Sequence, residues 1–212
     1  MSSVLVARKG RLQQRYEGHF RLVAGCIPYR LKADTDSHSG NLIDRLEVLM
    51  ISSPNRDDLV FPKGGWENDE TADEAACREA WEEAGVRGII SETYLDFWIF
   101  RSKSTQNSCS PEGACKGYIF ALKVTEELQC WPEQASHKRQ WVQVMEAFKL
   151  CRYEWMREAL RKFIQLMSVQ TMPPALELPM PPALELAEPK KSSFNDNVML
   201  VGMRVACPTS SW

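Results

Sequence analysis

The sequence of 212 residues is poor in groups that hold zinc and has no long apolar run. Its three histidines and seven cysteines are scattered, and the cysteines form no C-x-x-C pair. This spacing argues against a zinc site and a disulfide framework, and it favours a reducing compartment. No apolar run approaches the length of a transmembrane helix, so we expect no association with a membrane. The apolar patch near the start is too short for a secretory signal, and we do not expect secretion.

Acidic residues are missing from the start of the chain. Seven Lys or Arg residues but one acid, Glu17, lie within residues 1–33. Such a basic segment is compatible with a mitochondrial presequence, and equally with an arm that faces phosphate groups or solvent. The sequence therefore leaves a cytoplasmic and a mitochondrial location open. A basic arm would also suit a highly anionic ligand.

The composition predicts one soluble domain between two flanking segments. A hydrophobic content of 44% and a charged content of 25% are ordinary for a globular protein, and we expect a monomer. We assign a basic arm to residues 1–14, a domain to residues 15–168 and a tail to residues 169–212. The paired prolines in MPPALELP and MPPALELA predict a disordered tail, which could bind a protein partner. A pI of about 6.0 and the lack of an RNA-binding motif argue against nucleic acid as a partner.

Apolar patterning predicts strands and two helices in an α/β (α+β) sandwich with a mixed sheet. The Thr71-x-x-Glu74 spacing predicts a capping box that opens one helix, and Gly85 ends it. Apolar residues at helical spacing predict a second helix over residues 153–167. Short apolar or β-branched runs predict strands at residues 21–29, 46–52, 59–61, 93–100, 118–124 and 140–144. The polar connection at residues 102–115 is long enough to be a binding loop.

Three carboxylates share one face of the first predicted helix. Glu79, Glu82 and Glu83 stand at positions i, i+3 and i+4. Such a face repels itself unless a cation binds there, and hard divalent ions such as Mg²⁺ or Mn²⁺ select carboxylate oxygen. Alanines at positions 72, 75 and 76 should leave this face uncrowded. The opposite stripe is expected to pack on the sheet, and it consists of Cys77, Ala80, Trp81 and Ala84.

The residues around these carboxylates match a known pattern. Gly64, five residues, Glu70 and seven residues precede R-E-A-W-E-E-A-G-V at positions 78–86. This run resembles the signature of the Nudix hydrolases, with Ala80 smaller than the usual aliphatic residue. The resemblance implies a Nudix-type α/β/α sandwich and hydrolysis of pyrophosphate bonds with a divalent metal, which is Mg²⁺ or Mn²⁺ as its substitute.

The resemblance also implies a role for each residue of the signature. It assigns Glu79 and Glu83 to the metal, and it gives Glu82 the part of general base within the same metal-binding face. Arg78 should anchor the catalytic loop through Glu70. The carbonyl group of Gly64 should join the metal shell. The spacing by itself does not separate the roles of the three glutamates.

Further segments resemble the diphosphoinositol polyphosphate phosphohydrolase branch of the Nudix enzymes, especially its plant members. They are RYEG, RLVAGC, SSPNR, FPKGGWE and RQW, which begin at positions 15, 21, 52, 61 and 139. Members of this branch cleave inositol pyrophosphates and long diadenosine polyphosphates, so we expect a small polyanionic substrate. Candidate substrate-binding residues are cationic or belong to the glycine turn: Arg15, Arg21, Arg56, Lys63, Gly64, Gly65, Lys116 and Arg139. Animal members have a third glycine where Lys63 stands.

Two alternatives stay open. One is a general nucleoside-diphosphate pyrophosphatase of the ADP-ribose or NADH type. The downstream proline of the ADP-ribose-type members is missing between residues 87 and 110, which argues against it. The other is a non-catalytic Nudix domain that senses a polyphosphate. The complete set of signature carboxylates argues against that alternative.

Overall fold

The computed structural model describes residues 6–32, 41–52, 58–101 and 113–170. The chain divides into two units, Met1–Met172 and Pro173–Trp212. Most of the predicted tail, the predicted binding loop and Arg56 therefore lie outside the described residues. No helix in the described segments is long and apolar enough to cross a bilayer.

The described residues form one mixed sheet, as the sequence predicts, and this sheet has nine strands. The main path runs β4-β3-β2-β8-β6, and β1, β5, β7 and β9 pair beside it. The long strands β2 and β8 run parallel, whereas the other strand pairs are antiparallel. The strands are β1 (Tyr16–Glu17), β2 (Phe20–Leu31), β3 (Leu46–Ser52), β4 (Leu59–Val60), β5 (Lys63–Gly65), β6 (Val86–Ile90), β7 (Asp96–Arg101), β8 (Ala114–Glu127) and β9 (Arg139–Gln143).

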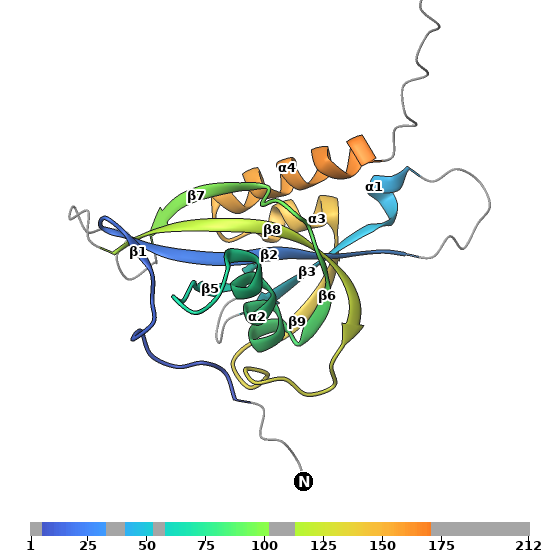
Figure 1. The fold of residues 1–212 in the computed structure, drawn as a ribbon. Coiled ribbons are helices and arrows are strands. Elements are labelled where there is room, and N and C mark those ends of the chain that lie inside the picture. The colour runs from blue at the N-terminus through green and yellow to red at the C-terminus, as the bar shows by residue number, and fades with distance from the viewer. Residues whose placement is uncertain (1–5, 33–40, 53–57, 102–112, 171–212) are drawn as a thin grey trace, which may run out of the picture. The chain divides into compact units, whose positions relative to one another are not determined.

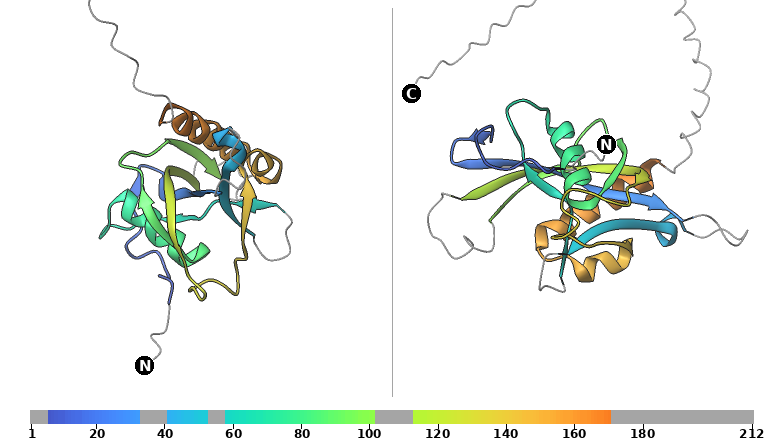
Figure 2. Two further views of the ribbon diagram at one scale, coloured as in Figure 1. Left: turned by 90° about the vertical axis from the view of Figure 1, so that its right-hand side faces the viewer. Right: turned by 90° about the horizontal axis from the view of Figure 1, so that it is seen from below.

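Helices cover both faces of this sheet (Figures 1 and 2). They are α1 (Leu42–Arg45), α2 (Ala72–Ala84), α3 (Val144–Leu150) and α4 (Glu154–Gln170). Helix α2 lies on one side, and α3 and α4 lie on the other (Figure 1). The expected sandwich is therefore confirmed.

Local signals explain the two long helices. Thr71 and Glu74 form the predicted capping box at the start of α2, and Gly85 ends the helix with a φ of 62°. A Cβ at Gly85 would also lie 2.7 Å from the ring of Trp131. The predicted apolar stripe of α4 is buried, with Met156 and Phe163 fully inside the core.

The sequence patterns do not predict several of the observed helices and strands. Strand β6 and helix α3 are absent from the prediction, as are the short elements β1, β5 and α1. The predicted strand at 140–144 ends at Gln143, because the Gln143 side chain accepts hydrogen bonds from the backbone N–H groups of Met145 and Glu146 and so caps α3.

The predicted N-terminal arm does not form a separate segment where the structure describes it. Ala7 and Gln14 are buried. The Gln14 amide donates to the carbonyl groups of Leu22 and Trp66 at 2.8 and 3.1 Å, which ties the arm to the domain.

Candidate active site

Strand β5 brings the glycine turn against helix α2. The carboxylate of Glu79 lies so close to Gly64 that a Cβ there would overlap it. Gly65 is equally constrained, because a Cβ there would overlap the Gln14 side chain. Glycine at these two positions is therefore required by close packing of the turn against polar side chains.

Arg78 links the turn and the carboxylates. Its Nε and Nη2 donate to the two oxygens of Glu70 at 2.9 and 2.8 Å, which is the pairing that the resemblance implies. Nη2 also donates to the carbonyl oxygen of Gly65 at 2.8 Å. Nη1 donates to Glu79 Oε1 at 2.7 Å and to Glu82 Oε2 at 3.1 Å. One guanidinium therefore fixes both the loop and two of the three carboxylates.

The three carboxyl groups lie in a poorly solvated place. Glu79 and Glu82 are 7% and 3% exposed. Burial, reinforced by the charge of Glu83, raises the pKa of Glu79 to about 8. Burial also raises the pKa of Glu83 to about 7, although the cationic Lys63 side chain and a hydrogen bond from the Lys63 N–H oppose the shift. A divalent cation would offset this buried negative charge, so the residues fit a hard metal ion with oxygen ligands.

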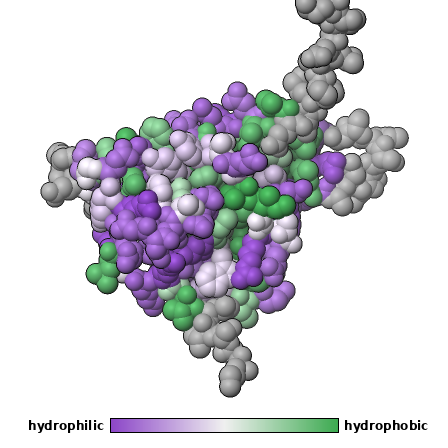
Figure 3. Space-filling model, viewed as in Figure 1, coloured by the Kyte–Doolittle hydropathy of each residue, from purple (hydrophilic) through white to green (hydrophobic). Residues whose placement is uncertain are grey.

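Hydrophilic side chains gather on the surface over β5 and the start of α2 (Figure 3). The N-terminal arm reaches this surface. The Arg8 backbone N–H donates to Glu82 Oε1 at 3.0 Å, and its guanidinium pairs with Glu67 at 2.7 Å and Asp69 at 3.0 Å. The arm was expected to face phosphate or solvent, yet Arg8 faces acidic side chains. No local pattern links residues 74 positions apart, so sequence reasoning missed this contact.

The expected division of α2 into an open face and a packed stripe is partly wrong. Ala75 and Ala76 are fully buried, because α2 presses this small-residue side onto the sheet. Ala80 and Ala84 are buried as expected. The other two residues of the stripe, Cys77 and Trp81, instead line a cavity of about 430 Å³.

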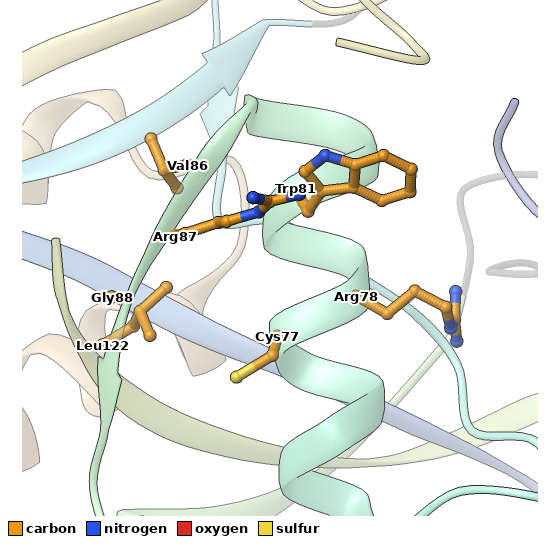
Figure 4. A pocket seen from close by; sticks show the side chains of 7 residues that line it. All are labelled: Cys77, Arg78, Trp81, Val86, Arg87, Gly88 and Leu122. Carbon is orange, nitrogen blue, oxygen red and sulfur yellow. The ribbon is translucent and has the colours of Figure 1, made fainter. Parts of the chain in front are cut away.

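That cavity lies between α2 and β6 (Figure 4). Cys77 points toward Leu122 of β8, and Arg87 extends from β6 toward Trp81. Arg78 also lines the cavity, but its guanidinium extends away from Cys77. Since Arg78 holds Glu79 and Glu82, the cavity and the carboxylates lie on different sides of the helix.

A second cavity, of about 190 Å³, adjoins the glycine turn. Arg21, Lys63 and Gly64, three of the candidate substrate-binding residues, line it. Sequence reasoning missed its remaining lining residues, which are Val23, Phe100, Arg101, Cys115, Arg152 and Tyr153. Strand pairing brings most of them together: Val23 pairs with Gly65, and Phe100 pairs with Cys115.

Three other candidate cations have partners within the domain. Arg15 donates to the carbonyl groups of Glu67, Asn68 and Glu70. Arg139 donates to the last carbonyl groups of α2 and lies over the ring of Trp131. Lys116 pairs with Glu17 at 2.9 Å. Arg15 thus links to the segment after Gly65, and Arg139 links to the end of α2. Contact of the three cations with substrate stays a prediction.

Comparison with known proteins identifies the class. The model of the NUDIX domain matches residues 39–166. The chain is 61% identical over 168 residues to Nudix hydrolase 12, mitochondrial, of Arabidopsis thaliana, covering 78% of this chain and 83% of that protein. It is 35% identical over 134 residues to diphosphoinositol polyphosphate phosphohydrolase 3-alpha of Mus musculus, covering 62% and 69% of the two chains.

A solved structure of a C. elegans Ap4A hydrolase shares the fold, with a TM-score of 0.50 and 23% identity over 70% of this chain and 98% of that chain. The chain belongs to the Nudix family, and the recognised resemblance is confirmed. It is a Nudix pyrophosphohydrolase, an enzyme that acts on phosphoanhydride bonds. Nudix hydrolases generally use divalent metal ions.

Proposed function

We propose that this enzyme hydrolyses pyrophosphate bonds in highly phosphorylated small molecules, namely diphosphoinositol polyphosphates, long diadenosine polyphosphates or both. The observation that carries the proposal is the 190 Å³ cavity beside Gly64. Four cationic side chains line it, from Arg21, Lys63, Arg101 and Arg152. Such a cluster favours a ligand with several phosphate groups over one with a single diphosphate.

The same cavity also contains two aromatic rings. Phe100 and Tyr153 both line it, and Phe100 stacks with Trp155 at 4.8 Å between ring centroids. Rings held in this way offer a surface for a nucleobase, which a dinucleoside substrate carries and an inositol phosphate lacks. The site therefore supports both substrate classes. The relatives agree with this, because one bears the name diphosphoinositol polyphosphate phosphohydrolase and one structural neighbour is an Ap4A hydrolase.

The proposed cofactor is Mg²⁺, with Mn²⁺ as a substitute. Glu79, Glu82 and Glu83 would hold it together with the carbonyl oxygen of Gly64. When bound, the ion would neutralise phosphate charge and acidify a water molecule. Glu82 would accept or orient the proton of the attacking water. Arg78 would keep Glu82 and Glu79 in position through its hydrogen bonds of 3.1 and 2.7 Å to their carboxylates.

A side-by-side assay tests the proposal. Tag-free protein is mixed with a diphosphoinositol phosphate, diadenosine hexaphosphate or ADP-ribose, in Mg²⁺ or Mn²⁺, and the products are identified by mass. We expect kcat/KM to be highest for one or both of the first two substrates. A preference for ADP-ribose would refute the substrate class, and tight binding without turnover would refute catalysis.

Lys63→Ala sharpens the assay. Removal of this cation should raise KM for the polyphosphates by about 10- to 100-fold, because one charge-assisted hydrogen bond contributes roughly 1.5–3 kcal/mol. KM for ADP-ribose should change less. Lys149→Ala is the matched control, since Lys149 pairs with Glu146 on α3 and does not line the cavity. Equal effects of the two variants would refute a role for the cavity.

We also propose a mitochondrial location. The Arabidopsis relatives numbered 12, 13 and 16 carry this location in their names, and the start of the present chain is basic and acid-free. A fluorescent fusion of residues 1–33 would test it, and a cytoplasmic signal would contradict it. A monomeric state and a protein partner for the tail stay predictions.

A further inference from the structure

The segment between β8 and β9 places two more potential ligands beside Glu83. One ligand atom each from Glu83, Glu133 and His137 lies within 4.8 Å of the others. His137 Nε2 is 3.2 Å from Glu133 Oε2 and 4.0 Å from Glu83 Oε1. The three side chains are 16–33% exposed, so they are partly withdrawn from solvent without being sealed off.

Backbone contacts hold this segment against the end of α2. The Glu133 N–H donates to the carbonyl group of Glu82 at 3.0 Å, and the Trp131 indole donates to that of Glu83 at 3.1 Å. The His137 N–H donates to the carbonyl group of Glu133 at 2.9 Å, which closes the turn. The backbone positions of the three residues are therefore set by the fold, so a cation would meet ligands that already lie close together.

The orientation of the His137 ring points to a cation. Its Nδ1 lies 3.0 Å from the carbonyl oxygen of Ser52. A carbonyl oxygen only accepts hydrogen bonds, so Nδ1 carries a proton and Nε2 is the ring nitrogen directed toward the two carboxylates. An Nε2 atom this close to carboxylate oxygens needs a proton or a metal ion between them. Histidines that bind metals commonly donate their other N–H to a backbone carbonyl in this way.

We propose that Glu83, Glu133 and His137 form a mixed nitrogen and oxygen site for a divalent transition-metal ion, adjacent to the carboxylate face of α2. Imidazole suits transition metals, whereas Mg²⁺ strongly prefers oxygen. The nitrogen ligand therefore favours a divalent transition-metal ion over Mg²⁺ at this site. This site rests on the proposed function only through Glu83, which both sets of ligands include.

Mn²⁺ is the probe for the test, because pulsed electron paramagnetic resonance detects the coupling of a bound imidazole ¹⁴N nucleus to the ion. Tag-free full-length protein is loaded with one equivalent of Mn²⁺, and calorimetry measures Mn²⁺ and Mg²⁺ binding. We expect ¹⁴N coupling in the wild type. In His137→Asn the coupling should vanish and Mn²⁺ affinity should fall by about tenfold or more, while Mg²⁺ affinity stays within about twofold.

His19→Asn is the matched control, because His19 is exposed and belongs to a different part of the domain. It should keep both the coupling and the affinity. Glu133→Gln is the second variant, to be used if His137→Asn fails to fold, and it should also weaken Mn²⁺ binding while sparing Mg²⁺.

Absence of ¹⁴N coupling in the wild type would overturn the proposal and leave His137 as an imidazolium ion paired with the two carboxylates. Coupling that persists in His137→Asn would overturn it as well. Neither the ¹⁴N coupling nor the calorimetry depends on turnover. Wild-type protein that shows the coupling but hydrolyses none of the substrates would therefore contradict the proposed function and not the metal site.

Discussion

The two sides of helix α2 are built by different means. On the side of β5, Arg78 donates to Glu70, Glu79 and Glu82, so charges and hydrogen bonds set the positions of the side chains. On the side of β6, Cys77 and Trp81 line a larger cavity. The Trp81 Nε1 is buried there and finds no hydrogen-bond partner in the described part of the chain. Hydrogen bonds and ion pairs position the side chains on the β5 side of the helix, whereas the β6 side is shaped mainly by packing.

Replacement of a carboxylate gives the sharpest test of this contrast. Glu82→Gln and Glu83→Gln keep the shape of the side chain but remove its charge, so each should lower kcat by roughly 10²–10⁴-fold. Circular dichroism should show an unchanged fold. Trp81→Phe, on the other side of the same helix, should retain kcat within about twofold. Rates like those of the wild type in either glutamine variant would refute the role of that residue.

Gly64→Ala tests the contact between the turn and the helix. The new methyl group would overlap the Glu79 carboxylate and push it out of position. We expect kcat to fall by one to two orders of magnitude, because displacement of about 1 Å in a reacting site costs roughly 10²-fold. Overpacking should also cost about 1–3 kcal/mol of stability. Steady-state kinetics and urea unfolding measure the two effects. Unchanged kinetics would show that the turn and Glu79 are not coupled.

The stability of the metal-free protein should fall as pH rises. Glu79 has a pKa of about 8 in the folded state against an ordinary value of 4.5, so between these values the folded state binds more protons than the unfolded state. Urea unfolding of metal-free protein at pH 5.5 and pH 8 would measure the loss. Glu79→Gln removes the titrating group and should show a smaller loss. The same pH dependence in both proteins would refute the raised pKa.

The sequence predicts the parts of this molecule that depend on local patterns. The Thr71 capping box, the Gly85 terminus and the buried stripe of α4 follow from spacing and are confirmed. Helix α3 follows a predicted strand directly, and its start depends on the side chain of Gln143. Single-sequence patterning cannot separate a strand from a helix when no turn intervenes.

The candidate site divides in the same way. The signature indicated which carboxylates lie together, because they share one helix. It did not indicate that Arg101 and Arg152 would join Arg21 and Lys63 at one cavity, since that depends on the pairing of distant strands. Nor did it show that Arg8 reaches Glu82. Contacts that only the tertiary structure creates are not reflected in any fixed spacing along the sequence.

The smallest expected effect separates two tryptophans near the C-terminal end of α2, Trp81 and Trp131. Trp81→Phe removes a buried N–H without a partner in the described residues, which offsets the lost apolar contact, so stability should change by less than about 1 kcal/mol. Trp131→Phe removes the hydrogen bond to the Glu83 carbonyl group and weakens the contact with Arg139. That variant should lose about 1–2 kcal/mol in urea unfolding. If the two variants were equally destabilised, packing and not hydrogen bonding would govern both sides of α2, and the contrast between them would fail.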